Sequence, residues 1–139
     1  MLLLDTHVWI WSIELDVRRI GRRARQLIKR AESQGAIRVS PVSLFELTAL
    51  YVAGRVRLAR PPEQWIRDSL EAPGLRLAEL SPAIAVDAGS IPREALADPM
   101  DRLLVATARQ LDATLMTSDA RILDYAAKTG NVRVHNGST

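Results

Sequence analysis

The sequence predicts an α/β protein in which helices cover both faces of a parallel sheet of about four or five strands. Short apolar runs alternate with helical patterns along the whole chain, which is typical of parallel strands joined by crossover helices. The predicted strands are apolar almost throughout, as strands buried on both faces are. No linker, internal repeat or low-complexity segment divides the sequence, so we expect residues 1–139 to form one domain.

In the first half of the chain, turn and cap residues delimit each element. Gly35 and Gly54 end two helices, because glycine readily adopts the left-handed conformation that follows a helix. Pro61 and Pro62 begin a third, since proline is favoured in the first helical turn. The predicted elements are a strand at 2–4, helices at 6–11 and 21–34, a strand at 37–39, a helix at 42–53 and a helix that begins at Pro61 and ends before Pro73.

The second half repeats the alternation of strand and helix. Pro99 begins a helix whose apolar residues recur with helical spacing, and the sequence Gly-Ser-Ile-Pro from Gly89 breaks the helix before it. The predicted elements are a strand at 75–80, a helix at 82–88, a helix at 99–111, a strand at 114–117, a helix at 119–128 and a strand at 132–134.

Composition excludes several classes of protein. With 47% apolar and 25% charged residues the chain is globular rather than disordered. The absence of cysteine excludes disulfides and thiolate zinc sites, and with only His7 and His135 an imidazole-rich metal site is not expected. No apolar run approaches the roughly 20 residues of a membrane span, and no signal peptide is expected. A cytoplasmic location and no membrane contact follow.

The net charge of +3 is unevenly distributed. Residues 18–30 read Arg-Arg-Ile-Gly-Arg-Arg-Ala-Arg-Gln-Leu-Ile-Lys-Arg and contain no acid. Such a cluster suits a phosphate backbone, although a solvated helix face explains it equally well. Aromatic residues are scarce, which argues against a platform for stacked bases, and we favour a core or interface position for Trp9 and Trp11.

Three acids follow predicted strands and should lie at one edge of the sheet, and two more begin the helix before the strand at 114–117. Asp5 follows the first strand, Glu46 lies in the helix after the second, and Asp119 comes two residues after the strand at 114–117. Sites in parallel sheets form beyond the carboxyl ends of the strands, where Asp98 and Asp101 join them if their helix begins there. Clustered carboxylates repel one another, and a hard cation such as Mg²⁺ or Mn²⁺ removes that repulsion.

Helix capping is the alternative explanation for most of these acids. Asp5 can cap the helix that begins near Thr6, and capping and metal binding stay equally open for it. Asp98 precedes a proline, so we favour a cap there and leave metal contact open. Asp101 lies in a first helical turn, where negative charge is favourable in any case. Asp119 competes with Ser118 to cap the last long helix.

The neighbours of these acids offer further candidates. Glu46 lies in an apolar run and is hard to explain as a solvent-facing residue. His7 is either a general base or, as we favour, a surface residue. Arg102 can hold the Asp101 carboxylate, contact a phosphate or form a plain surface ion pair. The hydroxyl groups that can orient carboxylates, or act as ordinary caps, belong to Thr6, Ser43, Thr117 and Ser118.

Four motifs, in this order and over nearly the whole chain, resemble those of a known family. They are LLLDTHVWIW at the start, VSPVSLFELTAL around Glu46, DPMDRLLVATA at residues 98–108 and LMTSDARIL at residues 115–123. Together they resemble the PIN-domain ribonucleases, specifically the VapC-type toxins of type II toxin–antitoxin systems. The resemblance implies a three-layer α/β/α sandwich and metal-dependent cleavage of RNA by a small cluster of acids.

Carried onto this chain, the resemblance assigns the four catalytic acids to Asp5, Glu46, Asp101 and Asp119. One or two Mg²⁺ or Mn²⁺ ions would be held by Asp5, Asp101 and Asp119, with Glu46 near and a direct role for Asp98 open. The resemblance also implies a homodimer and a cognate VapB-type antitoxin that inhibits the enzyme. The residues expected to hold the RNA backbone are Arg22, Arg23 and Arg25.

Other readings fit the sequence less well. Haloacid-dehalogenase-type phosphatases need a second aspartate two residues after the first, where this chain has His7. Response-regulator receivers need a lysine after the fifth strand, and neither Lys29 nor Lys128 is suitably placed. A non-catalytic PIN-fold module that binds RNA or protein stays open, although an intact set of acids argues against it.

Overall fold

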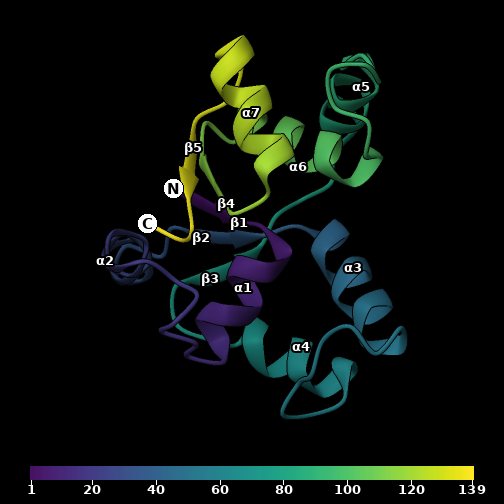
Figure 1. Ribbon diagram of the computed structural model, residues 1–139. Coiled ribbons are helices and arrows are strands. Elements are labelled where there is room, and N and C mark those ends of the chain that lie inside the picture. Colours follow the sequence, from purple (N-terminus) through teal and green to yellow (C-terminus); the bar gives the residue numbers. More distant parts are fainter.

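A five-stranded, fully parallel sheet of order β3-β2-β1-β4-β5 forms the centre of the molecule. The computed structural model describes residues 1–139, and Figure 1 shows its elements. The central position of β1 is set by its pairing with β2 on one side and β4 on the other. The strands are β1 (Leu2–Leu4), β2 (Ile37–Val39), β3 (Leu75–Leu77), β4 (Thr114–Thr117) and β5 (Val134–Asn136).

Helices lie on both sides of this sheet, so the predicted α/β class and three-layer architecture are confirmed (Figure 1). The lower layer in the figure contains α1, α2 and α4, with α3 at the side; the upper layer contains α6 and α7, with α5 packed on α6. The helices are α1 (Thr6–Ile13), α2 (Arg22–Ser33), α3 (Pro41–Val52), α4 (Pro62–Leu70), α5 (Pro82–Ser90), α6 (Pro99–Gln110) and α7 (Ala120–Thr129).

Alternation along the strands divides the apolar side chains between two cores. Leu2 and Leu4 of β1 belong to the cluster that α1, α2 and α4 cover, whereas Leu3 belongs to the cluster under α6 and α7. In β4, Met116 belongs to the first of these clusters and Leu115 to the second. Every apolar residue of these two strands is therefore buried, which explains why the strands read as uninterrupted apolar runs.

The structure corrects two predicted strands. β3 was expected at 75–80 but ends at Leu77, because its partner β2 ends where Ser40 caps α3 and only one further hydrogen bond, from Ala78 N to Val39 O, extends the pairing. β5 was expected at 132–134 but spans Val134–Asn136. Val132 is buried in the core under α7 rather than paired in the sheet, so its apolar character reflects packing.

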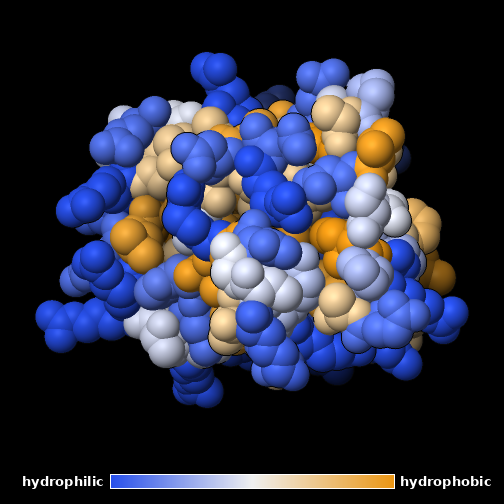
Figure 2. Space-filling view, turned by 90° about the horizontal axis from the view of Figure 1, so that it is seen from above, coloured by the Kyte–Doolittle hydropathy of each residue, from blue (hydrophilic) through white to orange (hydrophobic).

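The outer surface is mostly polar. Viewed from above, with α5 and α7 nearest the reader, hydrophilic side chains predominate and apolar ones form small separate patches (Figure 2). None of the helices has the length and apolar composition that a membrane span requires.

Candidate active site

The carboxyl ends of β1 and β4 lie side by side, and an acid follows each strand. Asp5 comes directly after β1, and its backbone N–H donates to Met116 O of β4 at 2.9 Å. Asp119 comes two residues after β4 and precedes α7. Because the strands are parallel, the helices that follow them begin at the same edge of the sheet. The first turns of α1, α3 and α7 therefore surround this edge.

Asp5 is held rigidly by two hydrogen bonds. Its Oδ1 accepts from the Thr6 backbone N–H at 2.7 Å, and its Oδ2 accepts from the Thr117 hydroxyl at 2.5 Å. Asp5 therefore caps α1, and at the same time it occupies the predicted edge site. Burial raises the pKa of Asp5 and outweighs these two hydrogen bonds; the negative charge of Glu46 raises it further, while His7 lowers it.

The hydroxyl of Thr117 couples Asp5 to Asp119. It donates to Asp5 and accepts from the backbone N–H of Asp119 at 3.0 Å, so one buried side chain fixes the ends of both strands. A second hydroxyl pair joins α1 to α3: Thr6 Oγ1 donates to Ser43 Oγ at 3.0 Å. Since α3 carries Glu46, these contacts fix the relative positions of the elements that bear three of the acids.

Asp101 is a second buried acid at this edge, after Asp5. It is only 6% exposed, and its Oδ2 is buried without any hydrogen-bond partner. Burial, followed by the charges of Asp98, Asp119, Asp5 and Glu46, raises its pKa to about 7. The charges of the other four acids therefore all act on the Asp101 carboxyl group.

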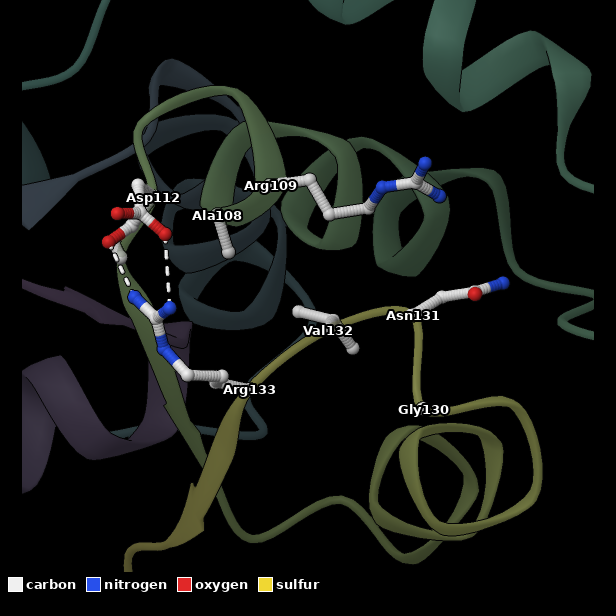
Figure 3. A pocket seen from close by; sticks show the side chains of 8 residues that line it. Ala108, Arg109, Asp112, Gly130, Asn131, Val132 and Arg133 are labelled. Carbon is white, nitrogen blue, oxygen red and sulfur yellow. Dashed lines mark hydrogen bonds and ion pairs between the residues drawn. The ribbon is translucent and has the colours of Figure 1, made fainter.

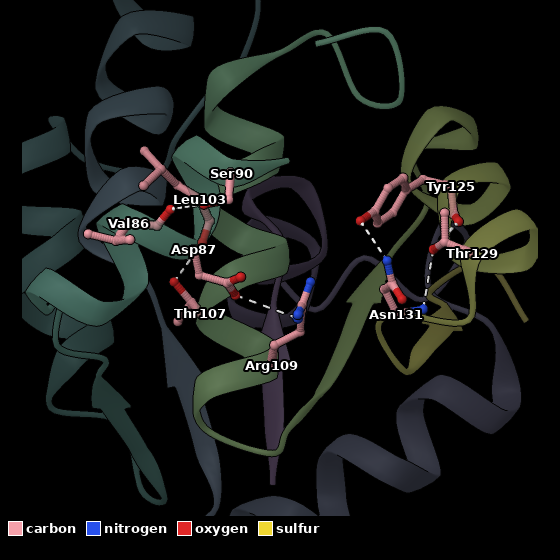
Figure 4. A network of polar contacts seen from close by, with 9 residues as sticks. All are labelled: Val86, Asp87, Ser90, Leu103, Thr107, Arg109, Tyr125, Thr129 and Asn131. Atoms are coloured by element: carbon pink, nitrogen blue, oxygen red, sulfur yellow. Dashed lines mark hydrogen bonds and ion pairs between the residues drawn. The ribbon is translucent and has the colours of Figure 1, made fainter. Parts of the chain in front are cut away.

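Another buried carboxylate, that of Asp87, has a cationic neighbour that Asp101 lacks. Asp87 of α5 also has a buried oxygen without an aligned hydrogen bond, but that oxygen lies 3.5 Å from Arg109 Nε of α6. Figure 4 shows this ion pair between the two helices. The charge of Asp87 is thus compensated by a neighbouring cation, whereas no cationic side chain forms an ion pair with Asp101.

Asp98 and Asp119 are both helix caps. Asp98 Oδ1 accepts from the Met100 backbone N–H, and Asp119 Oδ1 accepts from the Arg121 backbone N–H, each at 2.8 Å. Each cap uses one carboxylate oxygen, so capping and cation binding are compatible at these positions. Ser118 is not the cap of α7; its hydroxyl instead forms a hydrogen bond with Ser138.

Three other candidates differ in their surroundings. Glu46 is half-buried on α3 and forms no side-chain hydrogen bond or ion pair. Arg102 does not pair with Asp101; its Nη2 reaches the Ala97 carbonyl at 3.5 Å and its buried Nε has no partner. His7 is exposed in the first turn of α1.

The basic helix α2 stands apart from the acids. In Figure 1 it lies on the opposite side of the molecule from α3. Arg25 Nη1 donates to the carbonyls of Val17 and Ile20, so this side chain stabilises the loop before its own helix. Arg22 and Arg23 are exposed and form no side-chain contact with the acids.

The chemistry of the donor set fits a hard divalent cation. All the donors are carboxylate oxygens, which Mg²⁺ and Mn²⁺ prefer, and the unpartnered Asp101 Oδ2 lacks the positive neighbour that a cation would provide. No three acidic or histidine side chains already form a closed metal-binding group. The negative charges of the neighbouring acids raise the pKa of Asp5 and of Asp101, which a bound cation would counteract.

A hollow of about 330 Å³ elsewhere on the molecule is not part of this site. It lies between the end of α6, the turn before β4 and the segment before β5, at the amino-terminal edge of the sheet (Figure 3). Arg133 lies there with its guanidinium already bound to the carboxylate and carbonyl of Asp112. Because sites in parallel sheets form at the opposite edge, we assign no chemistry to this hollow.

Comparisons with known proteins agree with this fold. The sequence profile of the PIN domain matches residues 2–128. Ribonuclease VapC22 of Mycobacterium tuberculosis is 34% identical over 124 residues, which cover 88% of this chain and 90% of that protein.

Solved structures extend the likeness to the whole fold. The VapBC2 complex of Rickettsia felis, bound to a promoter DNA fragment, contains a chain that matches with a TM-score of 0.65 at 17% identity, over 97% of both chains. The DNA-bound VapBC of Salmonella typhimurium matches with a TM-score of 0.65 at 20% identity, over 96% of both chains. The chain belongs to the PIN-domain family and is of the VapC type.

Proposed function

We propose that this protein is a metal-dependent endoribonuclease that hydrolyses phosphodiester bonds in RNA and acts as the toxin of a toxin–antitoxin pair. The observation that carries the proposal is the buried, unpartnered oxygen of Asp101, a residue whose pKa is raised by burial and by the charges of four other acids. A folded protein keeps such a repulsive arrangement only when something outweighs its cost, and a catalytic cation does so. The ribonuclease name of the VapC22 relative supports the same activity.

Asp5, Asp101 and Asp119 are the proposed ligands of Mg²⁺ or Mn²⁺, with Glu46 nearby and the free oxygen of Asp98 as a further donor. When bound, such a cation lowers the pKa of water and offsets the charge that develops on the phosphate during hydrolysis. The same cation would lower the pKa of Asp101, which would then lose its proton at neutral pH.

The remaining residues hold and orient these ligands. The Thr6 N–H and the Thr117 hydroxyl fix both oxygens of Asp5, so that this carboxylate needs little reorganisation during the reaction. The amino-terminal ends of α1, α6 and α7 carry partial positive charge, which favours both carboxylates and a phosphate. Glu46 has no hydrogen-bond partner, so its carboxylate is free to accept a proton from the attacking water.

The proposed partners are the RNA substrate, a VapB-type antitoxin and a second copy of the chain. The solved relatives are VapBC toxin–antitoxin complexes, which supports an antitoxin. Phe45 and Val52 of α3, which are 63% and 80% exposed, give the molecule apolar surface that a protein partner can cover. A cytoplasmic location is part of the proposal, because RNA is available there.

The test is an RNA cleavage assay with purified protein in Mg²⁺ or Mn²⁺. We expect Asp5→Asn and Asp119→Asn to lower the cleavage rate at least about a hundredfold, because each removes a ligand charge. Asp112→Asn is the matched control: Asp112 is 88% exposed in the hollow at the opposite edge, and its loss should leave the rate unchanged.

The assay also decides between an enzyme and a binding module. Equal cleavage by wild type and both site variants would mean that a contaminating nuclease is responsible. If the wild type binds RNA but does not cut any RNA offered, the non-catalytic PIN-fold module becomes the better description.

A further inference from the structure

A second groove lies beside the acidic site, along the exposed face of α1. It encloses about 510 Å³ between α1, the loop that follows α1 and the loop between α3 and α4. Its helical wall is formed by His7, Ile10 and Trp11 of α1 and by the C-cap residue Glu14. We call it the α1 groove; its other lining residues are Asp16, Arg19, Arg55, Val56, Arg57 and Ala59.

Three arginines and two acids line the α1 groove, so its side chains carry a net positive charge. The Glu14 carboxylate already accepts two hydrogen bonds within the protein, from Ala59 N at 3.2 Å and from Trp65 Nε1 at 3.0 Å. Asp16 forms an ion pair with Arg19 at 3.4 Å. Arg55 and Arg57 are exposed and belong to no ion pair, so their charge is available to an anion.

An aromatic surface lies between these charges. Trp11 is half-buried, and its ring lies 6.0 Å from that of His7 at 51°. The Arg19 guanidinium lies 5.9 Å from the Trp11 ring centroid, at the outer limit of a cation–π contact. Arg19 is 64% exposed and can move aside for another planar group. Planar aromatic surface bordered by cations is the combination that binds single-stranded nucleic acid.

The groove begins where the acidic site ends. His7 follows Asp5 by two residues, in the first turn of α1, and lines the groove. From His7 to Glu14 the helix rises about 10 Å, roughly the length of two or three stacked nucleotides. A path along α1 would lead RNA from a phosphate at the acids past His7 into the groove.

We propose that the α1 groove binds the single-stranded RNA next to the cleaved phosphate, with a base against Trp11 and the backbone against Arg55 and Arg57. This inference rests on the proposed ribonuclease function and adds the RNA subsite to it. It moves the expected RNA contacts from α2 to the loop between α3 and α4. It also gives Trp11 a stacking role in place of the core or interface role that the sequence favours.

The first experiment measures RNA binding without cleavage. A fluorescent RNA of about ten nucleotides is titrated with the protein in EDTA, and anisotropy is recorded. We expect Arg55→Ala/Arg57→Ala to weaken binding about tenfold and to lower its salt dependence. The charge-matched control is Arg76→Ala/Lys128→Ala, which removes two exposed cations from β3 and the end of α7 and should leave affinity within about twofold.

The second experiment isolates the aromatic ring. Trp11→Leu keeps apolar bulk but removes the stacking surface, so we expect about tenfold weaker binding, whereas Trp11→Phe should restore most of the affinity. Trp9 and Trp65 are buried, so quenching of tryptophan fluorescence by RNA should be largely lost in Trp11→Phe. Thermal unfolding of each variant verifies that it is folded.

The outcomes separate this inference from the proposed function. If the groove variants lose RNA affinity while the wild type cuts no RNA, the RNA subsite is supported and the proposed ribonuclease function is refuted. If the wild type cuts RNA and the groove variants bind as tightly as it does, the subsite is refuted alone. Loss of affinity in Arg22→Ala/Arg23→Ala, but not in Arg55→Ala/Arg57→Ala, would return the RNA contact to α2.

Discussion

Asp5 and Asp119 each perform a structural and a chemical task. Both cap a helix, and both lie beside a strand end where their charges act on Asp101. From the sequence, capping and metal binding looked like alternatives, but a carboxylate has two oxygens and a cap needs only one. Their spacing from the strands predicted that both lie at the carboxyl edge of the sheet. The unpartnered oxygen of Asp101 depends on packing around α6, which no local pattern contains.

Asp101 should make the metal-free protein less stable as pH rises. Its pKa of about 7 in the native state exceeds the unfolded value, so between roughly pH 4 and 7 the native state binds more protons than the unfolded state. The contribution of Asp101 to the free energy of unfolding therefore falls across that pH interval, by up to about 4 kcal/mol. We expect Asp101→Asn, in EDTA, to be more stable than wild type at pH 8 and to lose this advantage by pH 4.

Urea unfolding of both proteins at pH 4, 6 and 8 measures this difference. Asp112→Asn, which changes an exposed acid at the opposite edge, should show no such trend. A constant difference between Asp101→Asn and wild type at all three pH values would contradict a raised pKa.

Thr117 should matter far more for activity than its size implies. Its hydroxyl fixes both Asp5 and the backbone of Asp119, so Thr117→Val should weaken metal affinity or cleavage by about tenfold to a hundredfold. Thr107→Val is the control, because that buried hydroxyl donates only to Leu103 O within its own helix (Figure 4). Metal titration and cleavage rates measure both variants; similar losses in the two would refute the orienting role.

At the scale of elements, close packing between loops and helices determines features that the pattern of apolar residues does not predict. The turn before β3 passes directly over the end of α2, and Gly74 stands at this contact with φ of +76°. A Cβ there would lie 2.3 Å from the Glu32 carbonyl oxygen. The strand that follows pairs only as far as β2 extends, which is why residues 78–80 are not strand.

Gly74→Ala should therefore destabilise the protein more than an equivalent change in an open turn. Gly35 also has a positive φ, +64°, but a Cβ there meets nothing within 4 Å. We expect Gly35→Ala to cost about 1 kcal/mol, the penalty of the left-handed conformation, and Gly74→Ala to cost about 3 kcal/mol because backbone must also move. Urea unfolding compares the two, and equal costs would show that the contact with α2 is not rigid.

At the scale of the molecule, most of the prediction came from one rule: sites in parallel sheets form at the carboxyl ends of the strands. Parallel strands place Asp5 and Asp119 at one edge although 114 positions separate them in the chain. The same rule explains why the fold class was predictable, whereas the bounds of β5 were not, since an edge strand is defined by its partner. The α1 groove was not predictable, because Arg55 and Arg57 lie in a loop whose position depends on Glu14 and α4.

Metal binding should stabilise the whole fold in a manner that depends on pH. The cation and a proton compete for Asp101, whose pKa is about 7, so Mn²⁺ should raise the melting temperature more at pH 8 than at pH 5.5. At a metal concentration of about 100 times the dissociation constant, the gain is about 2.7 kcal/mol. Differential scanning calorimetry measures it; an equal shift at both pH values would place the cation away from Asp101.

The proposed function depends on one physical claim: Asp5, Asp101 and Asp119 hold a common divalent cation. The most direct measurement is an anomalous difference map from crystals soaked in Mn²⁺. We predict a peak between the carboxylates of Asp5 and Asp101, about 2.2 Å from an oxygen of each. Manganese found only at other acids, such as Asp112, with Asp101 still unpartnered, would contradict the claim.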